Sequence, residues 1–132
     1  DVSSVTNMSQ MFRSATAFNQ SLDSWDTSAV SNMSEMFQGA GTFNGYISQW
    51  NTASVSNMSR MFDGAFAFNQ DIGSWATGNV SGMVQMFRGA GLFNQDLSGW
   101  CVSGFSQEPF QFSEGASSWV LPKPVWGTCP EP

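Results

Sequence analysis

Apolar residues return along this chain with a period of 25 residues. The period is marked by Trp25, Trp50, Trp75 and Trp100. Between them the block Val-x-Asn-Met-x-x-Met-Phe-x-x-Ala-x-x-Phe-Asn occurs four times with few changes, beginning at Val5, Val30, Val55 and Val80. A repeat of this length cannot bury its apolar side alone, so neighbouring copies must stack and share one core. The pattern therefore predicts a repeat solenoid of four rungs.

Within one repeat the apolar spacing predicts a short helix. In the second repeat the apolar residues fall at i, i+3, i+4, i+7 and i+10, namely Met33, Met36, Phe37, Ala40 and Phe43. These positions share one face of a helix. Asn32 is placed to cap its N-terminus with Glu35 three residues later, and Asn7 with Gln10 repeats that arrangement. Glycine is placed to end each helix after about two turns, at Gly39, Gly64 and Gly89.

Extended segments are expected between these helices. Residues Gln70 to Trp75 place apolar side chains between turn-forming residues, which favours a short strand or an extended edge. A second extended segment is expected from Thr52 to Asn57. Because each repeat then contains a short helix and short extended segments, the expected fold class is an α/β repeat solenoid.

The repeat pattern decays after Trp100. Phe105 stands where the earlier repeats have valine, and Glu108 stands where they have the first methionine. The residues that follow are rich in proline and include Trp119 and Trp126. Such a sequence is typical of a terminal cap with a fixed, irregular structure. We therefore expect a four-repeat solenoid over residues 1–104 and a C-terminal cap over residues 105–132.

Both cysteines, Cys101 and Cys129, lie outside the repeated positions. Their placement favours a disulfide that staples the cap across a 28-residue step, with a stabilisation of about 3 kcal/mol. A structural disulfide implies an oxidising compartment. The alternative is a pair of unrelated buried thiols in a cytosolic protein, and titration of free thiols on the unfolded protein distinguishes the two.

The charge of the chain excludes several classes of partner. The net charge is −6, with only four basic residues and no histidine. A surface that neutralises phosphates cannot be assembled from these residues, so we expect no nucleic-acid binding. The same acidity argues against docking on anionic lipid. No apolar run of about 18 residues is present, so we expect no membrane insertion by this segment.

The residues offer little chemistry for catalysis. No histidine, no nucleophile–base pair and no glycine-rich phosphate loop is found, so we expect no enzyme activity and no cofactor. Asp71 and Asp96 share one repeat position with Asp23 nearby, yet one carboxylate per repeat is few for a Ca²⁺ site, and no metal is expected. The eight methionines could form a soft groove or bind copper, but their spacing favours core packing.

Three segments of the chain carry a resemblance to a known family. Asn32 to Phe37 reads Asn-Met-Ser-Glu-Met-Phe, Phe68 to Trp75 reads Phe-Asn-Gln-Asp-Ile-Gly-Ser-Trp, and Phe93 to Trp100 nearly repeats the latter. These phrases resemble the BspA-like leucine-rich-repeat surface proteins, whose 25-residue type is known from mycoplasma surface lipoproteins. The resemblance spans residues 1 to about 104.

This resemblance implies a leucine-rich-repeat-like stack in a secreted or cell-surface protein that acts in adhesion and partner binding. It supplies no catalytic residue. The asparagine ladder that bonds backbone groups in leucine-rich folds would have its counterpart at Asn19, Asn44, Asn69 and Asn94. The chain departs from the family pattern at Gly45 and Tyr46, where Gln-Asp is usual, and at Gly82, where the other repeats have asparagine.

Positions that vary between otherwise uniform repeats are candidates for ligand contact, because the core does not dictate them. Tyr46 and Phe66 are aromatic residues outside the core pattern, and a tyrosine hydroxyl suits a sugar or peptide partner. Phe66 could equally fill a local gap. Another variable position carries polar side chains, those of Arg13, Gln38, Asp63 and Arg88.

Together these features favour an extracellular or cell-surface binding and adhesion module. We expect it to recognise a protein or glycan on another surface, as the C-terminal part of a longer adhesin. Asp1 stands at the repeat position of Asp26, which suggests a fragment. The alternative is a structural spacer or a self-assembling, for example trimeric, fibre tip, with a homo-oligomer formed through the missing upstream region.

Overall fold

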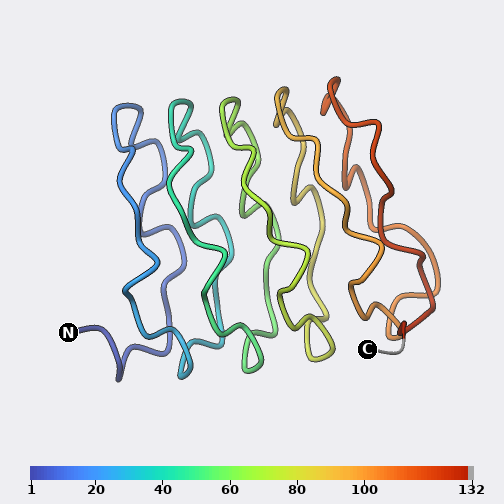
Figure 1. The fold of residues 1–132 in the computed structure, drawn as a ribbon, viewed down its shortest axis with the longest axis horizontal. Coiled ribbons are helices and arrows are strands. Elements are labelled where there is room, and N and C mark those ends of the chain that lie inside the picture. The colour runs from blue at the N-terminus through green and yellow to red at the C-terminus, as the bar shows by residue number, and fades with distance from the viewer. Residues whose placement is uncertain (131–132) are drawn as a thin grey trace.

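The computed structural model describes residues 1–130. Each repeat forms one coil, and Figure 1 shows the coils side by side in the order of the sequence, from the blue N-terminal coil to the red C-terminal segment. The turns at equivalent places in successive coils line up along two edges of the row. Residues that are 25 apart in the sequence therefore lie next to each other.

The expected α/β fold class is wrong. Residues 1–130 contain no helix and no strand, so the short helix predicted in each repeat is absent, and residues 70–75 do not form the strand that was one of the two expectations for them. The pairing that remains consists of isolated parallel β-bridges, Asn7 with Asn32, Asn32 with Asn57, and Asn57 with Gly82. The leucine-rich-repeat-like solenoid is wrong for the same reason, and most of the chain is irregular backbone held in turns.

Tight turns replace the predicted helix because only half of its amide groups bond within the coil. The N–H groups of Met36, Gln38 and Ala40 each donate to the carbonyl three residues earlier, over 3.0 to 3.3 Å. The amides between them donate to the next coil instead. They belong to Met33, Glu35, Phe37 and Gly39, whose acceptors are the carbonyls of Asn57, Ser59, Met61 and Asp63 at 2.8 to 2.9 Å.

The residues interpreted as helix caps form these turns. Glu35 has a φ of 58° and Gly39 a φ of 71°, each as the third residue of a turn, where a type II turn requires positive φ. The Asn32 side chain accepts a hydrogen bond from Ser34 N–H at 2.9 Å, which closes an Asx turn. Successive turns closed by hydrogen bonds between residues three apart place apolar side chains on one side at nearly the spacing of a helix, which explains the wrong prediction.

Aromatic columns fill the core along the row of coils. The Phe62 ring lies 4.1 Å from Phe68 in its own coil, 5.8 Å from Phe37 and 5.4 Å from Phe87, measured between centroids. All four rings are fully buried. The buried indole N–H groups are satisfied by the preceding coil, since Trp50 donates to the Leu22 carbonyl at 2.8 Å. The methionines also line this core, with Met11 the exposed exception.

The C-terminal segment, residues 105–130, closes the far end of the row. Phe112 and Trp119 are buried against the last repeat, with their rings at 5.4 Å and 5.2 Å from the Phe87 ring. The Trp126 ring then packs edge-on to Phe112 at 4.9 Å. The aromatic core is therefore covered at its C-terminal end.

Candidate functional site

The four polar residues predicted to contact a ligand all have partners in neighbouring coils: Gln38, Asp63 and Arg88 form one network, and Arg13 forms a separate ion pair. Asp63 is only 7% exposed and accepts hydrogen bonds from Arg88 at 3.0 and 2.8 Å and from the Gln38 amide at 3.0 Å. The hydrogen bonds and charge of Asp63 raise the pKa of Arg88 above its ordinary value. Arg13 approaches the Glu35 carboxylate to 3.7 Å. These side chains therefore hold neighbouring coils in register.

Phe66 forms an apolar projection on the surface. Its side chain is 56% exposed, and a Cβ placed on Gly91 would lie 2.5 Å from its ring. Leu92 is also exposed, and its N–H donates to the Phe66 carbonyl at 3.1 Å. Glycine at position 91 therefore leaves room for the ring, which fills that space and still presents most of its surface to solvent.

Tyr46 is the most exposed aromatic ring among the predicted contacts, at 60%. In residues 1–130 its hydroxyl has no hydrogen-bond partner. The residue before it, Gly45, lies against the Gln20 carbonyl oxygen, with which a Cβ at position 45 would collide. The departure from Gln-Asp at these two positions therefore allows a close approach between coils and places an aromatic ring at the surface.

A shallow groove of about 440 Å³ is lined by residues of the later coils that occupy the same repeat position as Tyr46. Its lining is Asp71, Gly73, Ser74, Gln95, Asp96, Ser98, Gly99 and Leu121. Asp71, Asp96 and Leu121 share the repeat position of Tyr46. The groove thus combines two carboxylates, an amide and hydroxyls with an apolar side chain at one end.

One oxygen of each groove carboxylate is used in a turn. Asp71 accepts from Gly73 N–H at 2.9 Å. Asp96 accepts from the Ser98 hydroxyl at 2.6 Å and from Ser98 N–H at 2.9 Å. These bonds lower the pKa of Asp96 below its ordinary value, with the hydroxyl as the larger cause. Both carboxylates are therefore fixed in orientation, and each keeps a second oxygen for a partner.

Asp23 does not line the groove with Asp71 and Asp96. Its carboxylate accepts from Gln49 N–H at 3.0 Å. Within the described part of the chain, no group of three or more histidine, cysteine, aspartate or glutamate side chains is close enough to hold a metal ion.

The asparagines of the expected ladder bond to the next coil. The side-chain oxygens of Asn19, Asn44 and Asn69 accept from the backbone N–H of the asparagine 25 residues later, at 2.8, 2.9 and 2.8 Å. Asn94 accepts from the N–H groups of Val120 and Leu121, both at 2.9 Å. Each side chain thus satisfies an amide that no backbone carbonyl reaches.

A second ladder, formed by threonine side chains, was not predicted from the sequence. The buried hydroxyls of Thr27, Thr52 and Thr77 donate to the carbonyls of Asn51, Ala76 and Cys101, at 3.0, 2.9 and 2.8 Å. A threonine two residues after tryptophan in three repeats was the available signal. It could have been recognised as a buried hydroxyl that needs a partner.

Replacing Asn69 with alanine is expected to lower the free energy of unfolding by about 1–2 kcal/mol. The Asn69 side-chain oxygen accepts from Asn94 N–H at 2.8 Å and from the Gln95 amide at 3.0 Å, and both donors lose this partner. Urea denaturation followed by tryptophan fluorescence measures the change. Gln107→Ala, at an exposed residue, is the control and should stay within about 0.5 kcal/mol of the parent. Equal effects of the two variants would contradict a structural role for the ladder.

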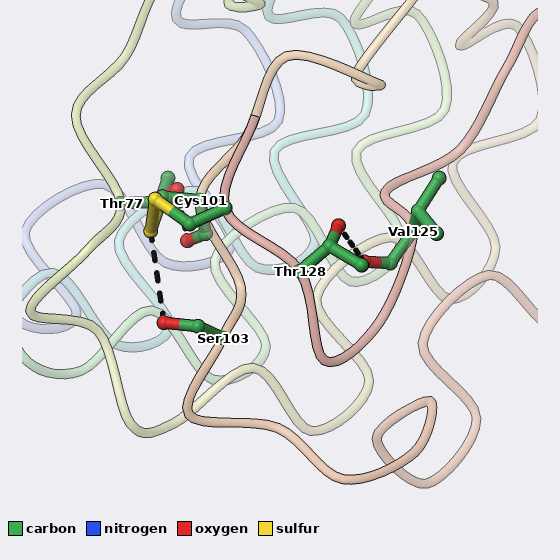
Figure 2. The surroundings of a disulfide bond; sticks show 6 residues. Thr77, Cys101, Ser103, Val125 and Thr128 are labelled. Carbon is green, nitrogen blue, oxygen red and sulfur yellow. Dashed lines mark hydrogen bonds between the residues drawn. A yellow bond between two sulfur atoms is a disulfide. The ribbon is translucent and has the colours of Figure 1, made fainter. Parts of the chain in front are cut away.

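Cys101 and Cys129 are joined by a disulfide. It connects the end of the last repeat to the end of the C-terminal segment. Figure 2 shows the Cys101 sulfur with the Ser103 hydroxyl 3.8 Å away. On the neighbouring segment in the same view, the Thr128 hydroxyl donates to the Val125 carbonyl at 2.6 Å.

A protein-family model described as "Mycoplasma protein of unknown function, DUF285" matches residues 6–119. The chain belongs to the DUF285 family. The match covers most of this DUF285 chain and extends from the first repeat to Trp119 in the C-terminal segment. Comparisons with curated proteins and with solved structures gave no match. In the part of the chain that the structure describes, no helix is long and apolar enough to cross a membrane.

Proposed function

We propose that this DUF285 chain is a binding and adhesion module, located outside the cell or at its surface, that recognises a protein or glycan on another surface. The proposal assigns it no reaction and no cofactor. The observation that carries it is the solvent-exposed Tyr46 ring, 60% accessible, at the repeat position that also lines the adjacent groove. Internal packing does not account for an aromatic side chain at that position.

The contrast between Tyr46 and the polar network supports this choice of site. Asp63 and Arg88 are bonded to each other, so a ligand would have to break an existing ion pair to reach them. A ligand could bind Tyr46 and the free oxygens of Asp71 and Asp96 without breaking an existing ion pair. An exposed aromatic ring suits the apolar face of a sugar, and the carboxylates and the amide of the groove suit its hydroxyl groups. The same groups suit the amides and basic side chains of a peptide.

The surface location is supported by two further features. The disulfide is of the kind that persists in oxidising environments. The repeat sequence resembles that of BspA-like surface proteins, and membership of the DUF285 family agrees with that resemblance at a coarse level.

Binding of the wild-type chain to a glycan array and to an array of extracellular protein domains tests the proposal. We expect Tyr46→Ala to weaken binding at least about 10-fold, because truncation of an aromatic hot-spot residue costs about 2 kcal/mol or more, and about 1.4 kcal/mol corresponds to 10-fold. Phe66→Ala should weaken it if the ligand also reaches the apolar projection. Ser21→Ala, at the same repeat position in the first coil, is the matched control and should bind normally. Unchanged binding by both aromatic variants would reject this site.

The second candidate function is a structural spacer or self-assembling fibre tip. It is favoured by the partly exposed rings of the first coil, which a partner could cover. Light scattering over a range of concentrations distinguishes the two. A concentration-independent monomer supports the binding module, whereas a stable trimer or larger assembly supports the fibre tip.

A further inference from the structure

The groove is lined by two aspartates that have no basic partner. Asp71 and Asp96 make no ion pair within residues 1–130, and the groove has no lysine or arginine among its lining residues. Lys123 instead places its ammonium 5.2 Å from the centroid of the Trp119 ring. The two aspartates lie close together, since a Cβ placed on Gly73 would be 3.2 Å from Asp71 Oδ1 and 2.7 Å from the Asp96 carbonyl oxygen. Like charges on adjacent segments repel each other, so a cationic partner would relieve this repulsion.

The other polar side chains of the groove offer acceptors more than donors. The Gln95 amide nitrogen donates to the backbone and side-chain oxygens of Asn69, at 3.2 and 3.0 Å. A backbone carbonyl only accepts, so this contact fixes the amide and leaves Gln95 Oε1 as a free acceptor within residues 1–130. The Ser98 hydroxyl donates to Asp96. Among the described side chains that line the groove, only the Ser74 hydroxyl therefore remains free to donate.

A partner that matches this groove supplies hydrogen-bond donors and positive charge. Lysine and arginine side chains carry several N–H donors and no acceptor, whereas each sugar hydroxyl also has an oxygen that accepts. The exposed Tyr46 ring adds an aromatic face on which a cation can lie. These features favour the basic side chains of a protein over the hydroxyl groups of a glycan.

The spacing of the coils sets the spacing that the basic side chains need. Asp71 and Asp96 occupy one repeat position in successive coils. The buried rings three residues earlier in the same coils, those of Phe68 and Phe93, have centroids 5.8 Å apart. Residues two apart in an extended chain point to the same side at a separation of about 6.5–7 Å. An extended segment that lies along the row of coils can therefore place alternate side chains over successive coils.

We propose that the groove binds an extended segment of a partner protein that carries lysine or arginine at two alternate positions, one facing Asp71 and the other facing Asp96. The segment runs along the row of coils, so that its neighbouring residues reach toward Tyr46 at one end and Leu121 at the other. This inference rests on the proposed binding function and names the class of its partner.

Two capped peptides of identical composition test the proposal. Both contain two lysines and four threonines, with one threonine between the lysines in the first peptide and none in the second. Two-dimensional NMR of the full chain measures binding through the amide shifts of Gly73 and Ser98, whose N–H groups donate to the two groove carboxylates. We expect the alternating peptide to bind at least about threefold more tightly, because adjacent lysines of an extended chain point to opposite sides.

Substitution of either groove aspartate should weaken binding of the alternating peptide. We expect Asp71→Asn and Asp96→Asn each to weaken it at least about threefold, since asparagine keeps the hydrogen bonds of the turn and removes the charge. Asp26→Asn is the matched control and should bind normally. Asp26 lies outside the groove, and Ser28 donates to it from its N–H at 3.0 Å and its hydroxyl at 2.6 Å, as in the turn of Asp96.

Equal affinities of the two peptides, or equal losses for Asp26→Asn and Asp71→Asn, would overturn the proposal. An alternating peptide that leaves the amide shifts of Gly73 and Ser98 unchanged would also overturn it. On the protein and glycan arrays, loss of binding in Tyr46→Ala with normal binding in the double variant Asp71→Asn, Asp96→Asn would reject this partner class while leaving the binding module intact.

Discussion

Replacing Phe62 with alanine is expected to lower the free energy of unfolding by about 3–5 kcal/mol. The Phe62 side chain is fully buried, and its ring stacks on rings of its own coil and of both neighbouring coils. The change therefore opens a cavity in the middle of the aromatic column. A domain is commonly stable by about 5–15 kcal/mol, so the loss is a large fraction of the total. Urea denaturation monitored by tryptophan fluorescence measures it.

Phe66→Ala is the control for this experiment. It removes the same atoms only four positions away, but from a side chain that is 56% exposed. We expect a loss of about 1 kcal/mol or less. Similar losses for the two variants would contradict the assignment of Phe62 to a shared core.

Removal of the disulfide should have the next largest effect, a loss of about 3 kcal/mol in the free energy of unfolding. The bond spans a sequence separation of 28 residues, so its loss gives the unfolded chain many more conformations. Backbone hydrogen bonds near the bond join the same two segments, including Val102 N–H to the Thr128 carbonyl at 2.8 Å. Hydrogen exchange should therefore rise first around residues 121–129, where the end of the C-terminal segment is released.

The double variant Cys101→Ser, Cys129→Ser should match the reduced wild type in urea denaturation. Reductant should shift the wild type and leave the double variant unchanged, which separates the loss of the bond from other effects of the reagent. A wild type whose unfolding midpoint is unaffected by complete reduction would contradict the prediction.

Several features of the candidate site could be read from the sequence, while others depended on neighbours 25 residues away. Tyr46 and Phe66 were assigned to the surface because they occupy positions that vary between repeats, outside the core pattern, and both side chains are exposed. Asp63 varies in the same way, yet it is buried between Gln38 and Arg88. Whether a polar side chain is free depends on what the adjacent coil offers it, and a single repeat does not contain that information. The groove was missed because its lining comes from more than one repeat and from Leu121.

The sequence by itself determined the 25-residue period and the aromatic and methionine residues that fill the core. These features follow from the positions of the apolar residues along the chain, which the sequence gives directly. Only the tertiary structure decided the path of the backbone. Spacings of three and four residues suit both a helix and a run of tight turns. The turns prevail here because every second amide, such as those of Met33 and Phe37, finds its acceptor in the next coil, a partner that exists only once the coils are side by side.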